Sequence, residues 1–157
     1  NPGCVIGPMI DAKSGTRINA MLDDASAKGA KIVVGGHADG AVMPATIVDH
    51  VKPGMTIYDE ETFGPVAPLF KFDTEEEVIA KANDTIFGLA SYFYARDIGR
   101  IFRVAEAIEA GMIGINEGII STEVAPFGGV KESGMGREGS KYGLDDYLNI
   151  KYGCLAL

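Results

Sequence analysis

Two adjacent acidic residues in a bounded loop are the side chains of this sequence whose setting most suggests chemistry. Glu60 and Glu61 precede "TFGP" within the long stretch "KPGMTIYDEETFGP". Adjacent carboxylates on a helix usually form only a solvated face. A loop bounded by proline and glycine can instead hold one carboxylate and one aromatic ring, here Phe63, at the mouth of a pocket. The spacing alone leaves both interpretations open.

A second pattern with chemical meaning lies at residues 134–139, which read "GMGREG". This is G-x-G-x-x-G, the spacing of a nucleotide phosphate loop, which needs a hydrophobic strand before it and a helix after it. Here "VKES" precedes it, and 18 residues follow Gly139, too few for a helix, a second strand and an acidic ribose partner. The chain has 21 glycines, so a chance match is easy. We therefore predict that these glycines serve turns of an ordered loop.

Other catalytic patterns are weak. His37 and His50 have no second ligand at helical spacing, so we expect no metal site. Cys4 and Cys154 lie near opposite ends and form neither a metal spacing nor a disulfide framework, which favours reduced cysteines in the cytoplasm. No G-x-S-x-G occurs, so a serine hydrolase is not indicated.

Composition narrows the function classes further. The 157 residues include 14 Lys and Arg and 22 Asp and Glu, a formal net charge of −8. No basic cluster is longer than a pair, which argues against nucleic-acid binding. No apolar run approaches the roughly 20 residues that span a bilayer. The start has no basic region typical of a signal peptide, lacks Met and reads as mid-loop, so we expect a piece of a longer chain.

Helix and strand patterns alternate, which is typical of an α/β fold. Apolar residues at helical spacing predict a helix over about residues 11–28, which Gly29 is placed to end. Thr74 and Glu77 form a capping box that predicts a second helix, and Asp97 precedes a third. Strands are predicted in "KIVVGG" (31–36), "MPATIVDHV" (43–51), "VAPLFKF" (66–72), "GLASYFYA" (88–95, expected to be buried on both faces) and "GMIGIN" (111–116).

From Glu117 this periodicity ends. Residues 117–143 form a long glycine-rich stretch, and such loops are usually functional or disordered. Its apolar residues favour an ordered loop. The end, residues 145–157, predicts a short turn and a last strand. We find no repeat and no linker, so the pattern indicates one domain.

Three segments resemble the C-terminal part of the NAD(P)-dependent aldehyde dehydrogenases. They are residues 7–36, "EETFGPV" (60–66) and "GINEGIISTEVAPFGGVKESGMGREGSKYG" (114–143). The combination of Glu-x-Phe-Gly-Pro, Pro-Phe-Gly-Gly-x-Lys and Ser-Gly-x-Gly-Arg-Glu is highly specific, and the resemblance runs along the whole chain. Within the family, residues 117–143 followed by "YLNIKY" are most similar to the succinate-semialdehyde dehydrogenases.

The resemblance implies an α/β fold, an open sheet with flanking helices. Residues 1–147 would be part of the catalytic domain, and residues 148–157 an oligomerisation strand. It also implies that the cysteine nucleophile, which forms a thiohemiacetal and then a thioester, lies upstream of residue 1 with the general base and the oxyanion hole. Cys4 is not that nucleophile, because "NPGCVIG" does not match the motif. We expect no catalytic residue in this chain and no activity from it alone.

The resemblance assigns binding roles to four residues. Glu61 matches the glutamate that binds the nicotinamide-ribose hydroxyls, and Phe63 matches the aromatic residue that packs near the nicotinamide. Ser121 matches the serine that hydrogen-bonds the distal carboxylate of succinate semialdehyde. Phe127 matches a ring that lines the aldehyde tunnel. The cofactor, NAD or NADP, is expected to be held mainly by the upstream domain, and residues 134–139 to lie far from its phosphates.

The resemblance also implies a homo-oligomer, since the terminal strand crosses to a neighbouring subunit in the family. An internal edge strand is the alternative for that segment. Two other functions stay open: a dehydrogenase for another aldehyde, and a free-standing assembly module without catalysis.

Overall fold

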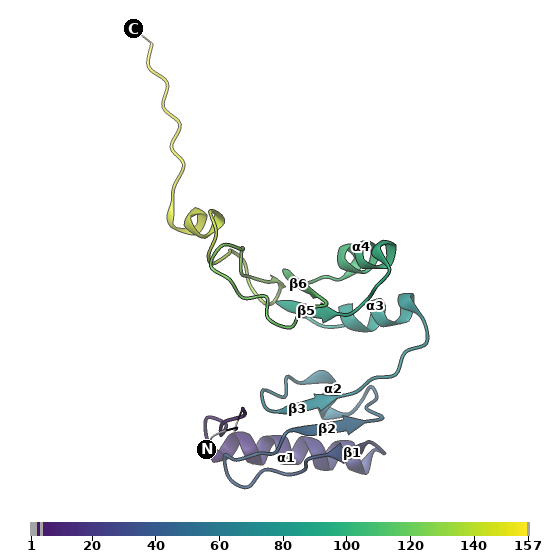
Figure 1. The fold of residues 1–157 in the computed structure, drawn as a ribbon. Coiled ribbons are helices and arrows are strands. Elements are labelled where there is room, and N and C mark those ends of the chain that lie inside the picture. The colour runs from purple at the N-terminus through teal and green to yellow at the C-terminus, as the bar shows by residue number, and fades with distance from the viewer. Residues whose placement is uncertain (1–2, 4, 157) are drawn as a thin grey trace. The chain divides into compact units, whose positions relative to one another are not determined.

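The computed structural model describes residue 3 and residues 5–156. The chain forms two compact units, Asn1–Phe72 and Asp73–Leu157. Both combine helices with strands (Figure 1), which confirms the predicted α/β class.

Helix α1 (Ala12–Ala27) of the first unit begins and ends where the sequence predicts. The Asp11 carboxylate caps its N-terminus by accepting a hydrogen bond from the backbone N–H of Ser14 at 2.8 Å. Gly29 follows with a φ of 98°, a conformation that glycine adopts without steric penalty, so the chain turns away there. One face of α1 is buried, formed by Gly15, Ile18, Met21, Leu22 and Ala25.

Helix α1 shares a hydrophobic core with a three-stranded sheet of order β1-β2-β3. Strand β1 (Lys31–Val34) is antiparallel to β2 (Thr46–Asp49), and β2 is parallel to β3 (Val66–Pro68). A short helix, α2 (Thr56–Asp59), interrupts the loop predicted between β2 and β3. The core contains Ile18, Met21, Leu22, Ala25, Ala30, Met43, Val48, Val51, Met55 and Ile57. Burial of each large side chain stabilises the fold by roughly 1.5–3 kcal/mol. Because Met43, Val51 and Met55 of the core lie in loops, the core also holds these loops in place.

In the second unit, α3 (Glu75–Asn83) and α4 (Ile98–Ala107) begin at the predicted caps, Thr74 and Asp97. Strand β5 (Ala90–Phe93) pairs in parallel with β6 (Met112–Ile115), and β4 (Phe87–Gly88) pairs antiparallel with β7 (Val130–Lys131). A 3₁₀ helix, Tyr142–Tyr147, follows the glycine-rich loop. The strands of this unit therefore form two small sheets.

The strand predicted at residues 88–95 differs from the structure in two ways. It is divided between the end of β4 and β5. It is also not buried on both faces, since Tyr92 and Tyr94 are 48% and 72% exposed.

The last strand predicted from the sequence is also absent from the described part of the chain. Residues 148–156 form neither helix nor strand. Their pairing with a neighbouring subunit stays a prediction.

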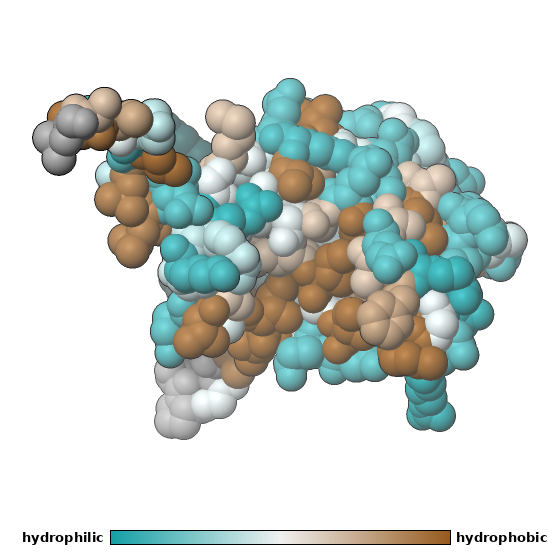
Figure 2. Space-filling view, turned by 90° about the horizontal axis from the view of Figure 1, so that it is seen from above, coloured by the Kyte–Doolittle hydropathy of each residue, from teal (hydrophilic) through white to brown (hydrophobic). Residues whose placement is uncertain are grey.

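Large apolar side chains of the second unit remain in contact with solvent. Among its described residues, Val104 is the buried hydrophobic one, while Leu89, Phe102 and Tyr147 are all more than two-fifths exposed. Figure 2 shows apolar residues, coloured brown, at the surface of the face in view. Contiguous apolar surface marks sites of contact with other proteins, with ligands or with membranes.

Candidate functional site

The loop from Glu61 to Pro65 connects α2 to β3 and carries both residues that the family resemblance assigns to the cofactor. Glu61 is exposed, and Phe63 is 77% exposed. Phe63 has a φ of 46°, in the left-handed region that residues other than glycine seldom adopt. The loop therefore presents a carboxylate and an aromatic ring to solvent. A carboxylate can accept hydrogen bonds from a diol, and an aromatic ring can pack against a flat ring of a ligand.

Helix α1 holds the end of this loop. The Arg17 guanidinium donates to the backbone carbonyl oxygens of Glu61, at 3.0 Å from Nη1, and of Thr62, from Nη2. Gly64 lies against the core: a Cβ placed on it would meet Cδ1 of Ile18 at 2.4 Å. The close approach explains why glycine occupies this position.

The start of the same segment is also held by α1. The Asp24 carboxylate accepts a hydrogen bond from the backbone N–H of Thr56 at 2.8 Å and forms an ion pair with Lys28 at 2.6 Å. Lys28 first, and then the Thr56 N–H, lowers the pKa of the Asp24 carboxyl below its usual value. Lys28 also donates to the Gly54 carbonyl at 2.7 Å. Helix α1 thus fixes both ends of residues 54–62.

Phe63 lines an open pocket of about 390 Å³. The other wall of this pocket is the segment from Ile6 to Ile10, with Ser14 at the start of α1. Gly64 and Pro65 complete it. Most of the lining is apolar, so the pocket suits a flat, weakly polar ring.

In the second unit, Ser121 lies in the loop that follows β6. Asn116 anchors the start of this loop: its side chain accepts from the Ala95 N–H at 2.9 Å and donates to the Ala95 carbonyl at 2.8 Å. Ser121 is exposed. Its neighbours Ile120 and Thr122 line a pocket of about 260 Å³, but Ser121 itself is not part of that lining.

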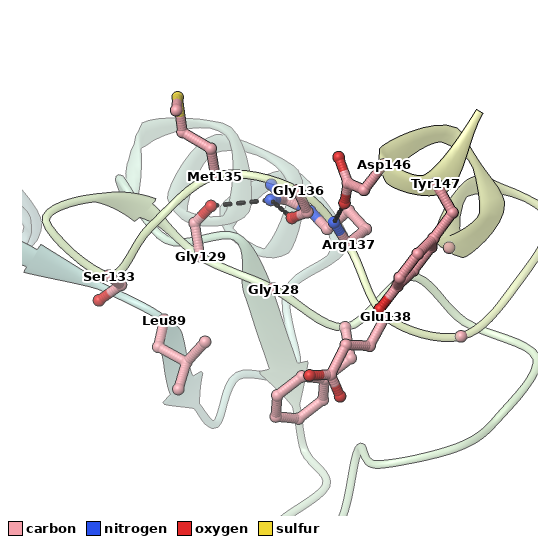
Figure 3. Close-up of a pocket in the computed structure, with 13 residues that line it drawn as sticks. Leu89, Gly128, Gly129, Ser133, Met135, Gly136, Arg137, Glu138, Asp146 and Tyr147 are labelled. Atoms are coloured by element: carbon pink, nitrogen blue, oxygen red, sulfur yellow. Dashed lines mark hydrogen bonds between the residues drawn. The ribbon is translucent and has the colours of Figure 1, made fainter. Parts of the chain in front are cut away.

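Phe127 lines the same pocket as Ile120 and Thr122. Two backbone hydrogen bonds with Glu138, at 2.9 and 2.7 Å, hold Phe127 against the glycine-rich loop. Phe127 also lines a second pocket of about 470 Å³, whose other residues Figure 3 shows. Within the second unit, the structure thus brings Phe127 to the residues that flank Ser121.

The loop at residues 134–139 has the surroundings of a structural turn. Arg137 Nη1 donates to the carbonyl oxygens of Gly129 and Gly136 at 2.8 and 2.6 Å, and the Asp146 carboxylate accepts from the Arg137 backbone N–H at 3.3 Å (Figure 3). A Cβ on Gly136 would meet Asp146 Oδ2 at 2.3 Å. The Asp146 carboxylate thus occupies the side of the backbone where a phosphate loop would bind its phosphate. This supports the prediction that the glycines of residues 134–139 serve turns of an ordered loop.

Two residues that hold the candidate site in place were not found from the sequence, Arg17 and Lys131. Lys131 Nζ donates to the carbonyl oxygens of Asn83 and Thr85 at 2.9 and 3.2 Å and forms an ion pair with Glu109 at 2.5 Å. It therefore ties the strand after Phe127 to the ends of α3 and α4. The position of Lys131 in the Pro-Phe-Gly-Gly-x-Lys motif marked it as a residue of interest, but the motif does not reveal its partners Asn83, Thr85 and Glu109.

Two further observations concern the described residues as a whole. They contain no group of three or more His, Cys, Asp or Glu side chains that could hold a metal ion. None of their helices has both the length and the apolarity to cross a membrane.

Comparison with known proteins gives concordant matches. The aldehyde dehydrogenase family model matches residues 1–152. A glutarate-semialdehyde dehydrogenase from Pseudomonas putida is 57% identical over 156 residues, covering 99% of this chain and 32% of that protein. The Escherichia coli succinate-semialdehyde dehydrogenase (NADP+) GabD is 57% identical over 158 residues, covering 99% and 33%.

A solved structure matches equally well. The crystal structure of succinate-semialdehyde dehydrogenase from Burkholderia pseudomallei has a TM-score of 0.95 and 55% sequence identity, covering 100% of this chain and 33% of that chain. The chain thus spans about a third of the length of the proteins it matches. With the family model covering residues 1–152, the chain belongs to the aldehyde dehydrogenase family of oxidoreductases.

Proposed function

We propose that the full-length protein is an NAD(P)-dependent dehydrogenase that oxidises succinate semialdehyde to succinate. In this proposal the chain supplies one wall of the active site, with Glu61 and Phe63 on the cofactor and Ser121 and Phe127 on the substrate. The observation that carries it is the 57% identity, over 99% of the chain, to a relative named for this reaction.

The Glu61–Pro65 loop fits the nicotinamide half of such a cofactor. The exposed Glu61 carboxylate can accept two hydrogen bonds from the ribose diol. The exposed Phe63 ring limits the movement of the nicotinamide, and hydride transfer requires the reacting atoms to be held close together. Bound NAD(P)+ supplies the hydride acceptor.

The loop around Ser121 fits the substrate. The Ser121 hydroxyl donates a hydrogen bond to the distal carboxylate of the semialdehyde, and the Phe127 ring excludes water from the aldehyde end. By the family resemblance, the thiohemiacetal and thioester form on a cysteine outside this chain. Water then hydrolyses the thioester to the carboxylic acid.

Substitution of Ser121 in the full-length enzyme tests the substrate assignment. Ser121→Leu removes a hydrogen bond to a charged group, worth roughly 1.5–3 kcal/mol, so kcat/KM for succinate semialdehyde should fall about 10- to 100-fold. Butanal has the same chain length without the carboxylate, so its kcat/KM should not fall. Ser121→Thr keeps the hydroxyl and serves as the matched control. Equal losses on both aldehydes, or no loss, would refute the role of Ser121.

A second candidate substrate is glutarate semialdehyde, one carbon longer. It is favoured by the equal 57% identity to the Pseudomonas putida relative named for it. Measurement of kcat/KM for both semialdehydes with the wild-type enzyme decides between them, since the semialdehyde with the higher value is the substrate.

We also propose that the enzyme is a cytoplasmic homo-oligomer joined through residues 148–157. The exposed free thiol of Cys154 fits a reducing compartment. Leu148, Ile150 and Tyr152 are all more than half exposed, and pairing with another subunit would cover them.

A further inference from the structure

One stripe of helix α1 faces the segment that leads to the cofactor loop. Arg17, Met21, Asp24 and Lys28 follow one another at spacings of four, three and four residues, which places them on one side of the helix. The three charged members all bond to residues 54–62. These contacts divide residues 54–62 into a part held by Asp24 and Lys28 and a part held by Arg17.

The first part is held without Arg17. Asp24 binds the N–H of Thr56 at the start of α2, and Lys28 binds the Gly54 carbonyl. The buried side chains of Met55 and Ile57 add core contacts. Helix α2 therefore keeps its place when Arg17 is changed.

The second part, Glu61 to Phe63, depends on Arg17. Both side chains of the proposed cofactor wall are exposed, so little packing fixes them. The planar guanidinium fork bonds two consecutive carbonyl oxygens, those of Glu61 and Thr62. These bonds fix the peptide planes on either side of Thr62, and with them the directions of the two side chains.

The strained backbone at Phe63 strengthens the same conclusion. A φ of 46° is unfavourable for a phenylalanine and persists only where the surroundings enforce it. Arg17 acts immediately before this residue, and the contact of Gly64 with Ile18 acts immediately after it. Without Arg17, only one of these two constraints remains.

From this geometry we infer that Arg17 is a positioning residue, which orients Glu61 and Phe63 for the nicotinamide end of the cofactor by fixing the carbonyl groups of Glu61 and Thr62. The inference rests on the proposed function of Glu61. Arg17 acts through the loop backbone, and its removal should weaken cofactor binding while leaving the aldehyde-binding residues of the second unit unchanged.

The test uses four variants of the full-length enzyme: Arg17→Met, Arg17→Lys, Glu61→Gln and Lys13→Met. Lys13→Met is the matched control, because Lys13 is an exposed cation one turn earlier on α1. The Kd for NADPH or NADH is measured by fluorescence titration, and KM for each substrate by initial rates. Loss of two charge-assisted bonds predicts that Arg17→Met raises the cofactor Kd about tenfold, with aldehyde KM within about twofold of wild type. Arg17→Lys, which can bond one carbonyl, should restore part of the affinity.

The Glu61→Gln variant separates the inference from the proposed function. If Glu61→Gln weakens cofactor binding and Arg17→Met does not, the role of Arg17 is refuted while the role of Glu61 stands. If Glu61→Gln has no effect, both roles fail. A purely structural Arg17 would instead change cofactor and aldehyde KM together, which also refutes the inference. Should Arg17→Met not fold by circular dichroism, wild-type cofactor affinity in Arg17→Lys would refute it, and an intermediate affinity would support it.

Discussion

Replacing Gly64 with alanine places a methyl group between the cofactor loop and the core of the first unit. The new Cβ would lie 2.4 Å from Cδ1 of Ile18 and 3.4 Å from Sδ of Met9. Ile18 is 0% exposed and belongs to the hydrophobic core, so its side chain can move away from the methyl group only by repacking against other core residues. The φ of Gly64 is not positive, so alanine is compatible with the backbone and the cost arises from crowding alone.

The expected change in the free energy of unfolding follows from two contributions. Insertion of a methyl group into a packed core costs about 1–3 kcal/mol. Gly→Ala also lowers the conformational entropy of the unfolded chain, which stabilises the folded state by about 0.4–1 kcal/mol. We therefore expect Gly64→Ala to lower the free energy of unfolding of the first unit by roughly 1–2 kcal/mol.

A double mutant isolates the contact. Ile18→Val removes the clashing Cδ1 and alone costs about 0.5–1.5 kcal/mol. In that background the alanine at residue 64 has room, so the double mutant should be more stable than the sum of the two single changes predicts, by about 1 kcal/mol.

Hydrogen exchange of the α1 amides in the 157-residue chain is the assay. The sequence has no Trp, and Tyr58 is the one tyrosine of residues 1–72, so fluorescence does not report on the first unit separately. Gly7→Ala is the control, since a Cβ there meets no heavy atom within 4 Å. Exchange in Gly64→Ala as slow as in Gly7→Ala, or strictly additive effects in the double mutant, would show that the crowding argument is wrong.

Two further predictions concern the tail and acid pH. Removal of residues 148–157 from the full-length enzyme should lower the number of subunits in the assembly, measured as its molecular mass by light scattering, because residues 148–156 form no strand in the described part of the chain; an unchanged subunit number would rule out the oligomerisation role. The lowered pKa of Asp24 means that its ionised form stabilises the fold at neutral pH, and that this stabilisation is lost as the pH falls below about 4 through the lower folded-state pKa. Exchange protection of the Thr56 amide should fall in that range, and Asp24→Asn should abolish the pH dependence; the same acid loss in Asp24→Asn would contradict this origin.

The helices were predictable because their start signals are local. Asp11, Thr74 and Asp97 each cap a backbone N–H three residues later, a relation visible in the sequence itself. Helix α2 was missed because its N-terminal N–H bonds to Asp24, 32 residues away. A four-residue helix has little stability of its own, so only the folded structure reveals it.

The candidate site divides in the same way. The exposure of Glu61 and Phe63 follows from their loop between proline and glycine. Arg17 was missed because its partners are backbone carbonyls 44 and 45 residues away. Every residue has a backbone carbonyl, so the residue types do not reveal which one accepts a hydrogen bond. The boundary between the units, after Phe72, was missed because it follows the apolar run "LFKF", without the composition of a linker. The residue roles themselves came from the family resemblance and remain predictions.

The most direct measurement is a crystal structure of the full-length enzyme with NAD(P) and succinate bound. We predict that one cleft contains all four residues, with a Glu61 carboxylate oxygen about 2.5–3.0 Å from a nicotinamide-ribose hydroxyl and the Ser121 hydroxyl at hydrogen-bond distance from the succinate carboxylate. A structure in which the ribose contacts neither Glu61 nor Phe63, or in which Ser121 and Phe127 face away from the ligand, would contradict the proposed active-site wall.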